Sequence, residues 1–163
     1  MAFSPDIIVT GEDTPRMLLV AEAKLSSRVH KDDEFRLKSY MLQMRCPIGL
    51  LVTPEVIEVF RDTYTAHSEN SVERVGTFPA PKDWDIFRAP HHGSGGKDPS
   101  DAHFESRFEG AVKSCLELLG SSPSPCMKEL PEEAREALSD YVVPALKQGV
   151  IRSSGPRESL QSH

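Results

Sequence analysis

The stretch SPDIIVTGEDTPRMLLVAEAK, residues 4–24, places two apolar runs on either side of a short turn. The runs at residues 6–10 and 17–24 are rich in aliphatic and β-branched residues, which favour strands. The Gly, Asp and Pro between them are typical turn residues. The pattern predicts an antiparallel pair of strands. The second run is apolar on both faces near its middle, as expected for a central strand of a sheet.

Three charged residues interrupt these apolar runs. Asp6 begins the first run, and Glu22 and Lys24 end the second. Residues two apart on a strand leave the same face, and the start of one antiparallel strand lies beside the end of its neighbour. We therefore expect all three side chains to converge at one end of the sheet.

Two carboxylates at one place repel each other and are costly to bury unless a cation lies between them. Oxygen ligands of this kind suit Mg²⁺, which binds through one or two carboxylates and keeps water in the rest of its shell. A lysine beside such an ion can contact a phosphate oxygen or orient a water molecule. The three residues therefore predict metal-assisted hydrolysis of a phosphodiester.

The sequence DDEFRLKSYMLQMR, residues 32–45, predicts a helix. Acidic residues lie in its first turn, where the helix dipole favours them, and apolar residues recur at helical spacing. Short apolar runs at residues 48–53 and 56–62 predict two further strands. The chain then divides into a core at 1–64, an irregular loop region at 65–104, helices at 105–149 that pack on the same domain, and a flexible tail at 150–163.

Composition is that of an ordinary globular protein with one domain: 163 residues, 38% hydrophobic and 27% charged. The net charge of −6 argues against strong nonspecific binding to nucleic acid, although the predicted helix and the residues before it are locally basic. No apolar run is long enough to span a bilayer, so no membrane association is expected. Cys46, Cys115 and Cys126 form no CxxC pair, which favours reduced thiols and a cytoplasmic location.

Pro5-Asp6 followed by Glu22-Ala23-Lys24 resembles the PD-(D/E)XK nuclease superfamily, in which an Asp and an acid-x-Lys lie on adjacent strands. The segment FRLKSYMLQMRCPIGLLVTPEVIEVFRD, residues 35–62, resembles the corresponding part of the nuclease domain of type I restriction enzyme R subunits. The resemblance covers residues 4–64. It implies an α/β, restriction-endonuclease-like fold, with a mixed central sheet flanked by helices and with additional C-terminal helices.

The activity implied by the resemblance is that of a Mg²⁺- or Mn²⁺-dependent endonuclease acting on DNA, or alternatively RNA, in restriction and defence or in repair. The implied metal ligands are Asp6, Glu22 and the backbone carbonyl of Ala23, with Lys24 assisting the attacking water or stabilising the phosphate. Arg36 and Lys38 would hold the nucleic-acid backbone, and Tyr40 matches the Tyr of the family's Gln-x-x-x-Tyr helix.

The chain departs from the family pattern in two places. Arg36 stands where the helix motif has Gln, and only five residues precede Asp6, where the family has a helix and a first strand. A fold truncated at the N-terminus would leave an unpaired strand, which we expect a second copy or a partner subunit to complete. The alternative function is a catalytically inactive nuclease-fold module that binds protein or nucleic acid.

Other residues are assigned no chemistry. APHHGS, residues 89–94, resembles the His-His-Gly segment of some metallo-β-lactamase-fold proteins, but the HxHxDH cluster of that fold is absent, so His91 and His92 are interpreted as loop residues. Trp84 is predicted to anchor the core, Phe60 and Tyr64 to pack in it, and Cys115 to be buried on a helical stripe.

Overall fold

A computed structural model of the chain describes residues 5–25, 31–65, 68–87, 100–121, 128 and 130–153. Its strands are β1 (Ile7–Gly11), β2 (Met17–Ala23), β3 (Ile48–Val52), β4 (Val56–Asp62), β5 (Val72–Pro79) and β6 (Gly149–Ser153). Its helices are α1 (Lys31–Met44), α2 (Ser100–Ser121), α4 (Glu132–Ala137) and α5 (Val143–Gln148), with 3₁₀ turns η1 (Glu69–Ser71) and η2 (Lys82–Phe87) and a π-helical segment, Leu138–Val142. The protein is mixed α/β.

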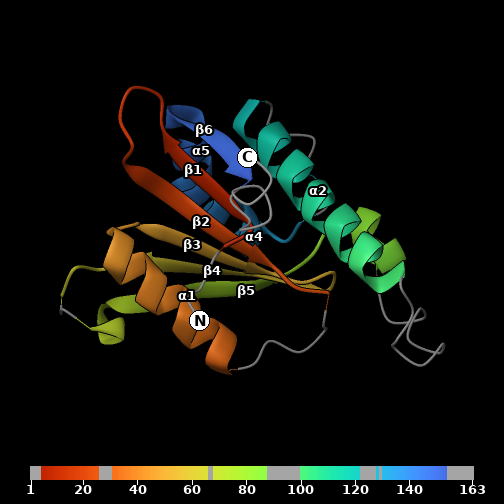
Figure 1. The fold of residues 1–163 in the computed structure, drawn as a ribbon, viewed down its shortest axis with the longest axis horizontal. Coiled ribbons are helices and arrows are strands. Elements are labelled where there is room, and N and C mark those ends of the chain that lie inside the picture. Colours follow the sequence, from red (N-terminus) through yellow and green to blue (C-terminus); the bar gives the residue numbers. More distant parts are fainter. Residues whose placement is uncertain are drawn as a thin grey trace, which may run out of the picture.

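The strands form one six-stranded sheet in the order β5-β4-β3-β2-β1-β6 (Figure 1). Strands β2 and β3 are parallel, and every other neighbouring pair is antiparallel. A parallel pair needs a crossover connection, which α1 supplies between β2 and β3. The predicted hairpin, helix and third strand are therefore confirmed.

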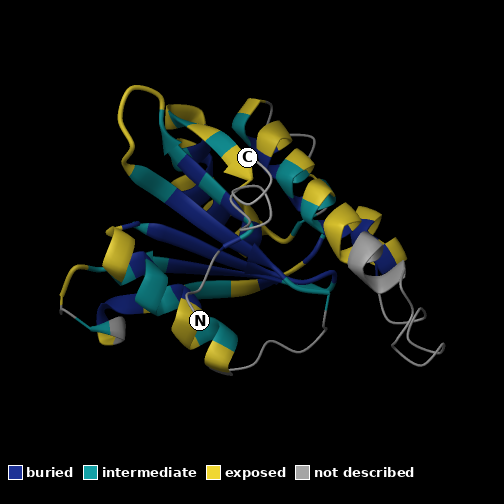
Figure 2. Cartoon of the chain, viewed as in Figure 1, coloured by how far each residue is buried: buried dark blue, intermediate teal, exposed yellow. Residues whose placement is uncertain are grey.

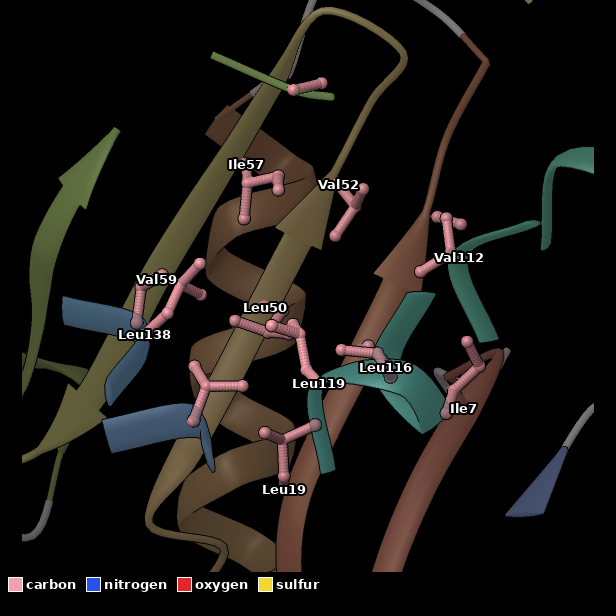
Figure 3. Close-up of a cluster of buried hydrophobic side chains, with 14 of the residues drawn as sticks. Ile7, Leu19, Leu50, Val52, Ile57, Val59, Val112, Leu116, Leu119 and Leu138 are labelled. Carbon is pink, nitrogen blue, oxygen red and sulfur yellow. The ribbon is translucent and has the colours of Figure 1, made fainter. Parts of the chain in front are cut away.

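Helices cover both faces of the sheet. Helix α1 packs on one face through Leu37 and Met41, and it approaches β3 closely, since a Cβ on Gly49 would lie 2.5 Å from the Met41 sulfur. Helices α2, α4 and α5 lie on the opposite face, where they bury the larger apolar cluster (Figures 2 and 3). We call these the α1 face and the α2 face.

Alternation along β1 and β2 assigns each side chain to a face. Ile7 and Leu19 are fully buried on the α2 face (Figure 3), and each such side chain stabilises the fold by about 1.5–3 kcal/mol. Val20 packs on the α1 face. Glu22 follows the same alternation as Val20, so the pleat directs it to the α1 face, whereas Asp6 lies just before β1 begins.

Residues 65–104, expected to be irregular, contain regular structure where they are described. Strand β5 pairs with β4 at the edge of the sheet, and most of its side chains are exposed or half-exposed. Turn η2 places Trp84 in the core, where its ring lies 5.5 Å from that of Phe108 at a right angle. The prediction for Trp84 is confirmed, and the prediction of a loop at β5 is wrong because that strand is too polar to be recognised from its pattern.

The predicted flexible tail begins instead with a strand. Strand β6 is antiparallel to β1 along its whole length, from Gly11 opposite Gly149 to Ile7 opposite Ser153. The expected unpaired strand beside Asp6 is therefore wrong, and so is the reason for expecting another subunit to complete this edge. Gly149, the first residue of β6, is extended, and it is glycine because a Cβ would lie 2.5 Å from the Thr10 carbonyl oxygen.

The C-terminal helical region is divided into α4, the π-helical segment and α5. Pro144 lies in the first turn of α5, directly after the π-helical segment, and a proline has no backbone N–H for the regular α-helical hydrogen bond. Cys115 on α2, expected to be buried, is partly exposed. Within the described part of the chain, no helix combines the length and the apolar character needed to cross a bilayer.

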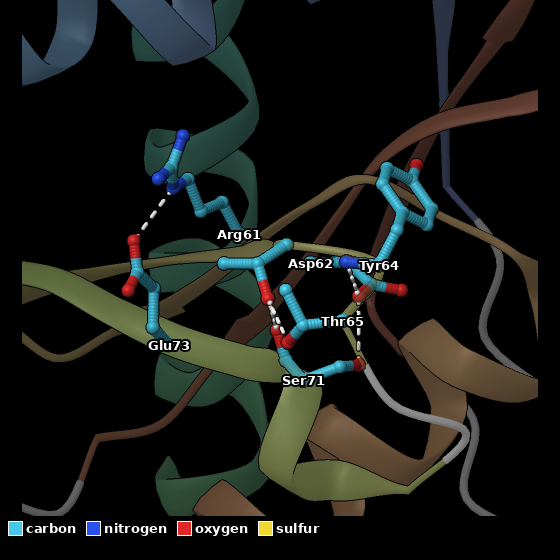
Figure 4. Close-up of polar contacts among 7 residues, drawn as sticks. Arg61, Asp62, Tyr64, Thr65, Ser71 and Glu73 are labelled. Carbon is cyan, nitrogen blue, oxygen red and sulfur yellow. Dashed lines mark hydrogen bonds and ion pairs between the residues drawn. The ribbon is translucent and has the colours of Figure 1, made fainter.

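A cluster of polar groups lies at the end of the sheet where β4 leads towards β5 (Figure 4). One carboxylate oxygen of Asp62 accepts hydrogen bonds from the Ser71 hydroxyl, at 2.7 Å, and from the Tyr64 backbone N–H, at 2.8 Å. Tyr64 itself is 64% exposed and has a left-handed backbone, so its predicted packing role is wrong, whereas Phe60 is buried as predicted. This end of the sheet is stabilised by polar groups that have partners.

Candidate functional site

Asp6 and Glu22 lie side by side where β1 begins and β2 ends. Ile7 is in register with Ala21, so Asp6, one residue earlier, stands opposite Glu22, one residue later. The backbone N–H of Ala23 donates a 2.8 Å hydrogen bond to Asp6 Oδ2, which fixes the orientation of that carboxylate. The structure therefore brings the two predicted acids together at this end of the sheet.

Glu22 is buried, and one of its carboxylate oxygens has no partner among the described residues to compensate for the loss of water. Only 8% of the residue is exposed, and its Oε1 is a buried oxygen with no hydrogen-bond partner. Burial, followed by the negative charge of Asp6, raises the pKa of Glu22 to about 8. Burial also raises the pKa of Asp6, against the opposing effect of the Ala23 N–H. Near neutral pH, and without a cation, this pair of acids therefore retains a proton.

Lys24 lies next to the acid pair and contacts two carboxylates. Its Nζ is 3.5 Å from Glu22 Oε2 and 3.5 Å from Asp33 Oδ1. Burial disfavours the charged amine, but the two carboxylates outweigh it and hold the pKa of Lys24 above its usual value. Lys24 is therefore a stable ammonium ion that still has about a third of its side chain exposed.

Asp33 was missed as a site residue by the sequence analysis, which interpreted the acids of this helix only through the helix dipole. Its side chain is 12% exposed and directed from the first turn of α1 to Lys24. The pattern that could have identified it is its spacing from Leu37. Residues four apart share a side of a helix, and Leu37 marks the side that packs on the sheet.

The structure separates the three predicted nucleic-acid contacts on α1. Lys38 forms an ion pair with Glu34 at 2.8 Å and lies over the Phe60 ring, on the flank of the helix towards β4 and β5. Arg36 and Tyr40 lie three and seven residues after Asp33, which places them on the opposite flank, the one towards Lys24. Arg36 is exposed and Tyr40 is partly buried. Lys38 is therefore not part of the site formed by Asp6, Glu22 and Lys24, which we call the acid–lysine site.

Helix α2 contributes a further acid, although the C-terminal helices were expected to carry no chemistry. Glu109 lies within hydrogen-bonding reach of the Asp6 carboxylate. In the described part of the chain, however, no three His, Cys, Asp or Glu side chains converge as a metal-binding group. His91 and His92 lie outside the described residues.

Comparison with protein-family models, with curated proteins and with solved structures finds no match to this chain. The chemistry of the site therefore has to be inferred from its own residues.

Proposed function

We propose that this protein is a divalent-metal-dependent nuclease that hydrolyses phosphodiester bonds, with DNA as its preferred substrate. The observation that carries the proposal is the pair of acids, half-buried Asp6 and buried Glu22, with an unpartnered oxygen on Glu22 and the ammonium group of Lys24 beside it. A buried acid pair that keeps a proton for lack of a cation is suited to exchange that proton for a metal ion.

Mg²⁺ or Mn²⁺ fits this set of donors. Both ions prefer oxygen ligands, and Mg²⁺ uses one or two carboxylates with water in the remaining positions. Oε1 of Glu22 would gain the partner that it lacks. The N–H of Ala23 points to Asp6, and a strand residue directs its N–H and C=O to the same neighbouring strand, so the carbonyl of Ala23 is the expected third ligand.

A bound metal would supply Lewis-acid polarisation of the phosphate and a water molecule of lowered pKa. The residues of the chain have separate tasks. Asp6, oriented by the Ala23 N–H, and Glu22 would hold the ion in place. Lys24 stays charged next to two carboxylates, so it is suited to stabilise a phosphate oxygen or to orient the attacking water, and not to remove a proton.

The topology supports a restriction-endonuclease-like fold within the proposal. The resemblance implies an Asp and an acid-x-Lys on adjacent strands of a mixed sheet, followed by a helix and a further strand. Strands β1, β2 and β3 with α1 have this arrangement. The strand that the family places before the Asp has its position taken here by β6, which comes from the other end of the described chain.

One observation favours the alternative of an inactive binding module. Lys24 is already engaged by Glu22 and Asp33 in a protein whose net charge is −6, and a phosphate would have to compete with both acids. The alternative and the nuclease differ in one measurable property, which is metal-dependent strand cleavage.

The test is cleavage of supercoiled plasmid, single-stranded DNA and RNA in Mg²⁺, in Mn²⁺ and in EDTA. We expect metal-dependent cleavage by the wild type, with DNA cut faster than RNA. Lys24→Ala should lower the rate by about a hundredfold or more, because it removes a charge next to the reacting phosphate. Lys147→Ala, which removes an exposed lysine from α5, should cut like the wild type. A wild type that cuts nothing in either metal, or an active Lys24→Ala variant, would overturn the proposal.

A further inference from the structure

The part of the α1 face formed by β1 and β6 is open to solvent in the described structure. Helix α1 packs on β2, β3 and β4, while α5 lies behind β1 and β6 on the other face (Figure 1). Register places Thr10 opposite Val150 and Ile8 opposite Arg152, and Ile8 packs with the α1-face cluster. We call these four residues the β6 strip. Ile8 and Thr10 are half-exposed, and Val150 and Arg152 are exposed.

Arg152 is fixed by a hydrogen bond through Nε, and the other N–H groups of its guanidinium remain available to bind an anion. Its Nε donates a 3.2 Å hydrogen bond to the hydroxyl of Thr10, across the strand pair. Among the described residues, no carboxylate forms an ion pair with Arg152. Arg61 and Arg74 differ, since each is paired with a glutamate at the other edge of the sheet. Because a guanidinium group has five N–H donors, a single bond through Nε leaves most of them for an anion.

The β6 strip is continuous with the acid–lysine site. Arg152 is opposite Ile8, two residues after Asp6. From the spacing of strands and the rise along them, the Cα atoms of Arg152 and Asp6 are about 8 Å apart. The bond from Nε to Thr10 directs the Arg152 side chain along the β6 strip, away from Asp6. Arg36 borders the site from the other side, on the flank of α1 that also carries Asp33. Two exposed arginines therefore lie on either side of the acid pair.

We propose that the β6 strip binds the sugar–phosphate backbone of the nucleic-acid strand as it leaves the acid–lysine site, with Arg152 on a neighbouring phosphate and Arg36 on the backbone at the other side. The inference rests on the proposed function and adds the surface and the direction of the bound strand. Arginine recognises phosphate through paired N–H groups, and the half-exposed apolar side chains of the strip offer contact to sugars and bases. The specific contacts of the strip are made to the sugar–phosphate backbone, so they give no specificity for base sequence.

The experiment measures binding without requiring cleavage. Fluorescence anisotropy of labelled single-stranded DNA, duplex DNA and RNA is recorded at several salt concentrations, with Ca²⁺ in place of Mg²⁺. Arg152→Ala should weaken binding about three- to tenfold for all sequences alike, and the slope of log affinity against log salt should fall by about one. Combining it with Arg36→Ala should weaken binding further.

Two further variants serve as controls for Arg152→Ala. Arg135→Ala removes an exposed arginine from α4, on the α2 face, and should leave both affinity and salt slope unchanged. Arg152→Lys keeps the positive charge but loses the paired N–H donors of the guanidinium group, so it should recover only part of the affinity that Arg152→Ala loses.

Each outcome decides between the proposals. Equal affinities for the wild type, Arg152→Ala and Arg135→Ala would overturn the β6 strip while leaving the nuclease proposal intact. An equal loss in both arginine variants would also overturn it, because the effect would then come from net charge alone. Binding that depends on Arg152 without cleavage in Mg²⁺ or Mn²⁺ would support the strip and overturn the nuclease. A wild type that binds no nucleic acid would overturn both.

Discussion

Glu22 and Glu58 are two buried glutamates on the same face of one sheet, and they lie symmetrically on either side of Leu51 of β3, with which each is in register. Both are less than a tenth exposed. Burial raises the pKa of Glu58, but Arg74 opposes this at 3.0 Å, whereas burial and Asp6 raise the pKa of Glu22 to about 8 and leave Oε1 without a partner. Burial of a carboxylate is thus common to a structural ion pair and a candidate site, and what differs is whether the charge is compensated.

The largest difference between the two glutamates is expected in cleavage. Glu22→Gln should lower the Mg²⁺-dependent rate on the order of a thousandfold, because the amide cannot replace a charged metal ligand. Glu58→Gln alters only the ion pair with Arg74 and should stay within about threefold of the wild type. Comparable losses in both variants would mean that the acid–lysine site is not where the chemistry occurs.

The second largest difference between Glu22 and Glu58 is expected in the pH dependence of stability. The folded-state pKa of Glu22 is about 8 against 4.5 for the free group, so between these values the folded state binds a proton that the unfolded state has released. The metal-free protein should therefore lose stability as pH rises from about 4.5 to 8, by on the order of 2–4 kcal/mol. Urea unfolding in EDTA at pH 5 to 8.5 measures this. The loss should disappear in Glu22→Gln and persist in Glu58→Gln, and a flat profile for the wild type would contradict it.

Metal binding should depend on the proton that the Asp6–Glu22 pair retains near neutral pH. Because a cation displaces it, the apparent affinity for Mn²⁺ should rise about tenfold for each pH unit between 6 and 8. Thermal unfolding with increasing Mn²⁺ reports this affinity through the upward shift of the midpoint. Asp6→Asn should abolish the shift, and Glu58→Gln should preserve it. An equal shift in the wild type and Asp6→Asn would place the metal elsewhere.

The smallest effect is expected at Asp33. Once a metal or a proton neutralises Glu22, Asp33 is the carboxylate that still holds Lys24 in place. Asp33→Asn should lower kcat about five- to tenfold with little change in KM, and it should add nothing to Lys24→Ala, since the two residues act together. Asp32→Asn removes the same charge from the same helical turn at an exposed position and serves as the control in steady-state cleavage. Equal kcat values for the two variants would exclude a positioning role.

Sequence patterns predicted the parts of the molecule that depend on neighbouring residues. The alternation in β2 was enough to place Glu22 and Lys24 on one face, because side chains on a strand alternate strictly, and the antiparallel pairing of β1 and β2 was enough to place Asp6 at the same end of the sheet. The crossover helix and β3 followed from apolar spacing. Asp33 and Glu109 were not predicted, because their roles depend on how α1 and α2 lie against the sheet.

The two edge strands were missed for different reasons. Strand β5 combines charged residues with Gly76 and buries few side chains, so it lacks the alternation of a half-buried strand. Strand β6 has five residues, and its partner β1 is far away in sequence, as the Arg152–Thr10 bond across 142 residues illustrates. Pairing over such a separation leaves no local pattern, because it is decided by tertiary packing.

The pairing of β1 with β6 also bears on when the sheet can assemble during synthesis of the chain. The strand after Asp6 is among the first of the described residues to leave the ribosome, and its outer neighbour is the last. Until residues 149–153 have emerged, β1 has an exposed backbone edge and lacks Arg152 beside it. A chain interrupted earlier would carry Asp6, Glu22 and Lys24 on a sheet whose β1 edge is still unpaired, so the order of the strands delays assembly of this edge until residues 149–153 have been made.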